Sequence, residues 1–130
     1  MASTCVLDAS AVVRLILLDP AAADWIQTLE TIALVLAPER MLTEVANTLC
    51  KLHRANQLQG VDPHALLIQA TGLIDQIEPD RHLQVEALAL AMHLNHSVYD
   101  CLYLALARRE AATLLTADQK LQSLARQVLP

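Results

Sequence analysis

Phenylalanine is absent from this chain of 130 residues, which contains only one tryptophan and two tyrosines. Hydrophobic residues still make up 55% of the sequence, so the core must be built from leucine, isoleucine, valine and alanine. Aromatic residues are too few for a platform on which a row of bases stacks, and we expect Tyr99 and Tyr103 in the core. With only Gly60 and Gly72, a glycine-rich loop that cradles phosphate is excluded, and helices should dominate.

Basic residues are also scarce, because nine lysines and arginines stand against fourteen acidic residues, for a formal net charge of −5. This balance argues against broad electrostatic binding of nucleic acid, which requires clustered positive side chains. A cluster of carboxylates that binds divalent cations also counts as negative, however, until ions neutralise it. The net charge therefore neither supports nor excludes nucleic acid as the substrate.

The sequence shows neither a signal peptide nor a membrane span, because no basic stretch precedes an apolar run and no run approaches about 18 residues. The three cysteines, Cys5, Cys50 and Cys101, lie in apolar segments and match no zinc pattern. We therefore expect buried, reduced thiols in a cytoplasmic protein. The length predicts one domain over residues 1–130.

Short apolar runs alternate with segments of helical periodicity along the whole chain. The strand pattern covers 4–7, 34–36 and 113–115, with 77–79 as a possible edge strand. The helical pattern covers 9–18, 21–32, 39–57, 63–77, 81–94, 99–109 and 117–128. This alternation predicts an α/β fold in which a parallel sheet lies between two layers of helices.

Three aspartates fall where this pattern changes to helix. Asp8 follows the first strand, Asp118 follows the last one, and Asp100 opens the most apolar helix. Ligands of open α/β folds bind at the carboxyl ends of the strands, which share one edge of the sheet. We therefore expect these three side chains to lie close together although they are far apart in sequence.

Helix capping is the competing explanation for each aspartate, since an Asp N-cap stabilises a helix by about 1 kcal/mol. Ser10 offers an alternative cap for the first helix, which frees Asp8. Thr116 begins a capping-box pattern, which frees Asp118. Asp100 lies in the first turn of a helix that is otherwise almost entirely apolar. Its carboxylate is therefore partly desolvated and requires a compensating cation.

Glu44 is the fourth candidate, because it lies at the margin of the apolar stripe on its helix and can face a cleft. The alternative is a solvated Glu44 paired with Arg40 one turn earlier. Four converging carboxylates would repel one another without a cation, and bound Mg²⁺ or Mn²⁺ removes that penalty. Two such ions about 4 Å apart can activate water and stabilise the leaving oxygen in a displacement at phosphorus.

With these four acidic residues in place, the sequence resembles the PIN-domain ribonucleases of the VapC toxin type. The resemblance rests on four segments in the expected order and spacing, which cover nearly the whole chain. These segments are 6–13, 38–49, 98–107 and 115–118. One departure is the end of the chain at Pro130, which leaves the family's last edge strand shortened or absent.

The resemblance implies a PIN-like three-layer fold, in which a short parallel sheet of four or five strands is flanked by about seven helices. It also implies an endoribonuclease that depends on Mg²⁺ or Mn²⁺ and is blocked by a small cognate antitoxin. The catalytic metal ligands carried over from the family are Asp8, Glu44, Asp100 and Asp118. Ser10 and Thr116 would hydrogen-bond to these ligands, and Arg14 would meet the phosphate of the substrate.

Two other functions remain open at this point. The chain is either an inactive PIN-like domain that acts as a binding module, or a metal-dependent phosphatase of small molecules. The helices between Leu15 and Leu36 also carry more apolar residues than one buried face requires. We therefore expect a homodimer surface or an antitoxin groove there.

Overall fold

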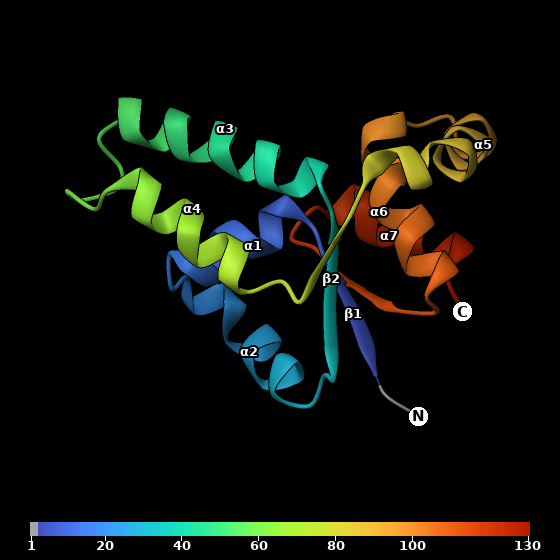
Figure 1. Ribbon diagram of the computed structural model, residues 1–130, viewed down its shortest axis with the longest axis horizontal. Helices are drawn as coiled ribbons and strands as arrows, with labels where there is room; N and C mark the ends of the chain where they lie inside the picture. Colours follow the sequence, from blue (N-terminus) through green and yellow to red (C-terminus); the bar gives the residue numbers. More distant parts are fainter. Residues whose placement is uncertain (1–2) are drawn as a thin grey trace.

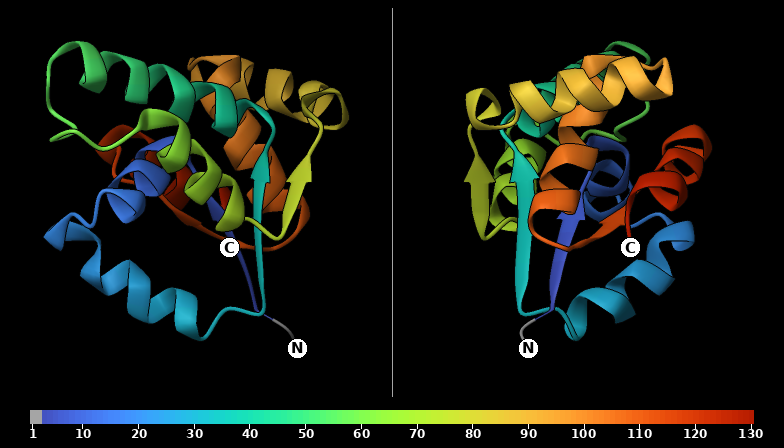
Figure 2. Two further views of the ribbon diagram at one scale, coloured as in Figure 1. Left: turned by 60° about the vertical axis from the view of Figure 1, so that its left-hand side comes forward. Right: turned by 90° about the vertical axis from the view of Figure 1, so that its right-hand side faces the viewer.

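A parallel sheet of four strands forms the centre of the computed structural model, which describes residues 3–130. The strands are β1 (Thr4–Leu7), β2 (Leu34–Pro38), β3 (Gln76–Glu78) and β4 (Thr113–Leu115). Their order across the sheet is β3-β2-β1-β4, and Figure 2 shows the arrows of β1, β2 and β3 pointing the same way. The two central strands are apolar and buried along most of their length, as is typical of a parallel sheet covered on both faces.

Seven α-helices cover the sheet in the part of the chain that the structure describes. They are α1 (Ala9–Ile16), α2 (Ala23–Glu30), α3 (Arg40–Arg54), α4 (Pro63–Gly72), α5 (Gln84–Leu94), α6 (Val98–Arg109) and α7 (Gln119–Val128). Helices α1 to α4 lie on one side of the strands and α5 to α7 on the other (Figure 1). Two short 3₁₀ helices, η1 (Pro20–Ala22) and η2 (Asp80–His82), precede α2 and α5. The three-layer α/β fold expected from the sequence is therefore confirmed.

Helix α6 forms the middle of the core. Every residue from Cys101 to Ala107 is buried, because the helix packs on β1 and β2 and also contacts α5 and α7. Its burial on all sides explains why the sequence shows no polar face there. The fold thereby fixes the first turn of α6, with Asp100, against the centre of the sheet.

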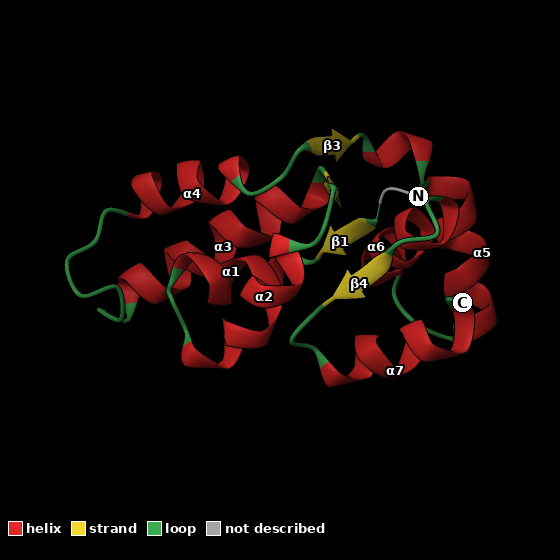
Figure 3. Cartoon of the chain, turned by 90° about the horizontal axis from the view of Figure 1, so that it is seen from below, coloured by secondary structure: helices red, strands yellow, loops and turns green. Residues whose placement is uncertain are grey.

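The sheet ends at β4 in the described residues 3–130, so the fifth strand left open by the sequence does not form there. Figure 3 shows β4 at the edge of the sheet with α7 beside it. The predicted helix over 81–94 starts later than expected, because residues 80–82 form η2 and the buried Leu83 precedes α5. No described helix has the length and apolar character that crossing a bilayer requires.

The prediction of three buried cysteines is wrong at one position. Cys5 and Cys101 are buried, and burial raises the pKa of the Cys5 thiol to about 12. Cys50 is exposed on α3. This helix buries a single stripe that contains Leu49, and the next residue along a helix points about 100° away from such a stripe.

Candidate functional site

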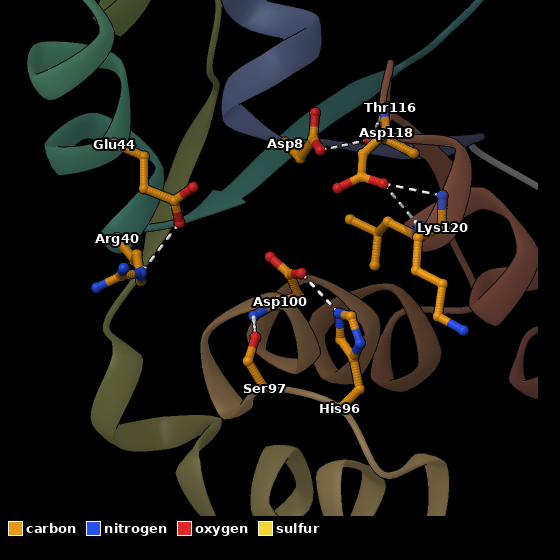
Figure 4. A network of polar contacts seen from close by, with 10 residues as sticks. Asp8, Arg40, Glu44, His96, Ser97, Asp100, Thr116, Asp118 and Lys120 are labelled. Atoms are coloured by element: carbon orange, nitrogen blue, oxygen red, sulfur yellow. Dashed lines mark hydrogen bonds and ion pairs between the residues drawn. The ribbon is translucent and has the colours of Figure 1, made fainter.

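The carboxyl edge of the sheet brings four acidic side chains around one space. Asp8 follows β1, Glu44 lies in the second turn of α3 after β2, and Asp118 precedes α7 after β4. Asp100 comes from the first turn of α6. Figure 4 shows the four carboxylates around this common space. The sequence predicts this for Asp8 and Asp118 from their positions after strands, for Asp100 from the start of an apolar helix, and for Glu44 from helical periodicity.

Asp8 is the most buried of the four, with 5% of its surface exposed. Its carboxylate accepts hydrogen bonds from Ser10 Oγ at 2.7 Å, from the backbone N–H of Ala11 at 2.9 Å and from Thr116 Oγ1. Burial raises the pKa of Asp8, and the nearby charge of Asp118 raises it further. Ser10 and Thr116 thus hold both carboxylate oxygens of Asp8, as the family resemblance implies.

The expectation that other residues cap the first and last helices is wrong. Asp8 itself caps α1, and Oδ1 of Asp118 caps α7 by accepting from the N–H groups of Lys120 at 2.9 Å and Leu121 at 3.2 Å. The Thr116 hydroxyl is already engaged, because it donates to Asp8 and accepts from the N–H of Asp118. Capping and a place in the site are therefore compatible, since the second oxygen of Asp118 is left to face the common space (Figure 4).

Glu44 is held between an arginine and a tyrosine. Its Oε1 accepts from Arg40 Nε at 3.0 Å and from the hydroxyl of Tyr103 at 3.2 Å. Burial raises the pKa of Glu44, and the charge of Asp100 adds to this shift. The ion pair with Arg40 that the sequence offers as an alternative is therefore present, but it lies within the acidic cluster.

Asp100 pairs with a histidine that the sequence prediction missed. His96 Nε2 lies 2.7 Å from Asp100 Oδ2, and Ser97 caps α6 by accepting from the N–H of Asp100 at 3.3 Å. The spacing of four residues is the only sequence signal for this pair. It carries little weight because His96 precedes the helix, where helical spacing does not predict contact.

The donor set of this cluster suits a hard divalent cation such as Mg²⁺ or Mn²⁺, which prefers carboxylate oxygens. Within residues 3–130, no three acidic, histidine or cysteine side chains are spaced to hold one ion as they stand. In this arrangement, Arg40 Nε donates to Oε1 of Glu44 at 3.0 Å, and His96 Nε2 lies 2.7 Å from Oδ2 of Asp100. A cation bound by all four carboxylates would have to replace these partners of Glu44 and Asp100.

The PIN domain model matches residues 5–127. The chain belongs to the PIN-domain family. The crystal structure of PAE2754 from Pyrobaculum aerophilum is similar to it, with a TM-score of 0.71 and 26% identity over 99% of this chain and 84% of that chain. No curated protein matches the chain. Membership of the PIN-domain family points to nuclease activity in general, typically with divalent metals.

Arg14, the predicted phosphate contact of this PIN domain, lies in the last turn of α1, whereas Asp8 caps the first. Its Nε is 3.9 Å from Oδ2 of Asp19, and its guanidinium lies 5.9 Å from the centre of the Trp25 ring. The structure therefore places Arg14 with α2 rather than with the four carboxylates. Arg40 is the arginine that contacts the acidic cluster.

Proposed function

We propose that this PIN domain is an endoribonuclease that depends on Mg²⁺ or Mn²⁺ and acts as the toxin of a toxin–antitoxin pair. The observation that carries the proposal is the convergence of Asp8, Glu44, Asp100 and Asp118 on one space at the carboxyl edge of the sheet. Hydrolysis of an RNA phosphodiester would leave a 5′-phosphate and a 3′-hydroxyl.

A divalent cation held by the four carboxylates supplies positive charge that stabilises the phosphoryl oxygens in the transition state. The chain's own contribution is to fix the oxygens that bind it. Ser10 and Thr116 hold Asp8 in one orientation, and the helix N-terminus holds Asp118. The Tyr103 hydroxyl orients Glu44 from the core side, although a cation would still have to displace Arg40 from the same carboxylate.

The openness of the site favours a polymer over a small phosphomonoester. The side chains of Glu44 and Asp100 retain 30% and 31% of their accessible surface. A groove of about 770 Å³ runs along β4 and α7, and none of the four carboxylates lines it. Small-molecule sites are usually concave and enclosing, so this surface suits a strand that lies across it.

Cleavage of defined oligoribonucleotides in Mn²⁺, with and without EDTA, tests the proposal. We expect cleavage that EDTA abolishes and that Asp8→Asn loses while its far-ultraviolet spectrum is unchanged. Asp62→Asn is the matched control, because Asp62 caps α4 in the same way but lies outside the cluster. Mn²⁺ binding without cleavage of any RNA would favour the inactive binding module. Faster hydrolysis of a phosphomonoester than of RNA would favour the phosphatase.

We also propose that the chain forms a homodimer through its α1–α4 face. Leu18, between α1 and η1, is 80% exposed, and Ile26 on α2 and Ile68 on α4 are exposed as well. A cleft beside Leu18 reaches Leu73 at the end of α4, so α1 and α4 share this apolar surface. Burial of such surface is the usual driving force for association.

The mass in solution by light scattering tests this dimer. We expect twice the chain mass for the wild type and a monomer for Leu18→Glu. Val85→Glu is the control, since Val85 is equally exposed on α5, away from this face. If the wild type is a monomer at 0.1 mM, the proposed dimer is contradicted.

One further partner and one further RNA contact belong to the same proposal. We propose a small antitoxin that blocks the site in the cytoplasm, and its positive side chains would compete for the four carboxylates. We also propose that Arg14, which lies outside the acidic cluster, contacts a phosphate further along the RNA. Arg14→Gln should then raise KM and leave kcat unchanged, and an unchanged KM would remove this role.

A further inference from the structure

One aromatic ring stands at the rim of the acidic cluster. Tyr99 precedes Asp100 in α6 and is 58% exposed, so its expected place in the core is wrong. Tyr103, one turn later, is buried. The difference follows from position, because Tyr99 lies in the first turn of α6, ahead of the buried stretch that starts at Cys101.

The guanidinium of Arg40 lies over the Tyr99 ring, and more than half of the Tyr99 surface is exposed. The guanidinium of Arg40 lies 3.8 Å from the centre of the ring, within the range of a cation–π contact. The same arginine donates to Glu44 at 3.0 Å, which ties the ring to the acidic cluster through α3. No hydrogen bond from the Tyr99 hydroxyl occurs among residues 3–130, so no internal polar network requires a tyrosine here.

Aromatic rings and arginine planes at an open surface are the groups on which bases of single-stranded RNA stack. We propose that Tyr99 stacks one unpaired base of the RNA substrate beside the scissile phosphate, and that Arg40 holds the ring in place. The inference rests on the proposed function, since it names how that site takes its substrate. A base inside a duplex presents no free face, so Tyr99 selects single-stranded RNA.

The arrangement also separates two roles. Tyr99 touches the substrate and is a binding residue for it. Arg40 acts through the ring and through Glu44, and is therefore a positioning residue. The ring is sequence-tolerant, because every base has a face that stacks, so this contact selects strandedness rather than base identity.

Binding of a fluorescein-labelled single-stranded RNA dodecamer in Mg²⁺ tests the stacking, with Asp8→Asn as the background that prevents cleavage. Adding Tyr99→Leu should raise Kd about tenfold, which lies in the lower part of the range for loss of one stacked base. Adding Tyr99→Phe should leave Kd within about twofold, because the ring remains. Equal melting temperatures of the two variants establish that both fold. An unchanged Kd for Tyr99→Leu would overturn the inference.

A spectroscopic signal checks the same contact directly. In a Trp25→Phe chain that carries Tyr99→Trp, the introduced indole is the sole tryptophan. Single-stranded RNA should quench its emission, and a duplex of the same sequence should not. Equal quenching by both would contradict stacking. Adding Arg40→Gln should lower the anisotropy of the indole before RNA is added, and an unchanged anisotropy would remove the positioning role of Arg40.

The two proposals fail in different ways. If the wild type cleaves RNA but Tyr99→Leu has the same KM and kcat, the stacking fails and the nuclease stands. If Tyr99→Leu weakens RNA binding but the wild type cleaves nothing in Mn²⁺, the nuclease fails and the stacking stands. A wild type that binds no single-stranded RNA at 0.1 mM protein overturns the stacking as well.

Discussion

Replacing Asp8 by asparagine should separate the stability of the apo protein from its response to metal. Burial raises the pKa of Asp8, which means that its ionised form is less stable in the folded chain than in water. Asparagine has nearly the same shape and can still accept from Ser10 and Ala11. We therefore expect Asp8→Asn to unfold at an equal or higher temperature than the wild type in EDTA.

The response to Mn²⁺ should change in the opposite direction. A ligand that binds only the folded state stabilises it by about 2.7 kcal/mol at 100 times its Kd. For a chain of this size, 1 kcal/mol corresponds to about 4 °C in the melting temperature. The wild type should therefore melt about 10 °C higher in saturating Mn²⁺. Asp8→Asn loses the charge at the centre of the cluster and should shift by no more than about 2 °C.

Differential scanning fluorimetry in EDTA and in a Mn²⁺ titration measures both effects. Asp62→Asn is again the matched control and should keep the full shift, because Asp62 is exposed and its hydrogen bonds go to His64 rather than to the cluster. The reasoning is refuted if Asp8→Asn retains the wild-type shift. It is also refuted if Mn²⁺ leaves the wild-type melting temperature unchanged at 10 mM.

Three further outcomes follow from the same contacts. In EDTA, raising the pH from 4 to 7 should increase the free energy of unfolding of Asp8→Asn relative to that of the wild type. The reason is that the raised pKa of Asp8 makes its ionisation destabilise the folded wild type over that range. Urea unfolding that shows the same difference between the two proteins at both pH values would contradict this. Tyr103→Phe should lower the free energy of unfolding by about 1 kcal/mol through the lost bond to Glu44, and an equal stability in urea would count against that bond. Thr116→Val leaves Asp8 and a backbone N–H without their buried partner and should cost about 1–3 kcal/mol. Thr71→Val, at an exposed helical site, should cost much less, and equal effects would contradict the role of Thr116.

The strands and the acidic residues that follow them were accessible from the sequence because both depend on short local patterns. An apolar run ended by an aspartate marks the end of β1, and the parallel topology then brings such ends together. Asp8 and Asp118 could thus be placed at one edge without knowledge of any tertiary contact. Glu44 was placed by helical periodicity alone, which gives a face but not a partner.

The contacts between elements were beyond such patterns. In the sequence, Tyr99 looks like one more apolar residue before the buried run of α6, and its exposure follows only from the packing around the first turn of that helix. The placement of Arg40 between Tyr99 and Glu44 depends on the same packing. His96 contacts Asp100 across the start of a helix, where helical periodicity has not yet begun.

Capping is a second case in which local rules were insufficient. The sequence treats capping and site chemistry as alternatives for Asp8 and Asp118, but a carboxylate has two oxygens. In the structure one oxygen of Asp118 satisfies the N-terminus of α7, and the other faces the cluster. Thr116 loses its expected role as a cap because its hydroxyl connects these two aspartates.

The central claim is that the four carboxylates bind divalent cations together. A crystal of the protein soaked in Mn²⁺, with anomalous diffraction data, measures this most directly. We predict an anomalous peak between Asp8, Glu44, Asp100 and Asp118, about 2.2 Å from at least two carboxylate oxygens, with Arg40 released from Glu44 and His96 released from Asp100. An empty cluster at 10 mM Mn²⁺, or a peak only at other surface carboxylates, would contradict the account.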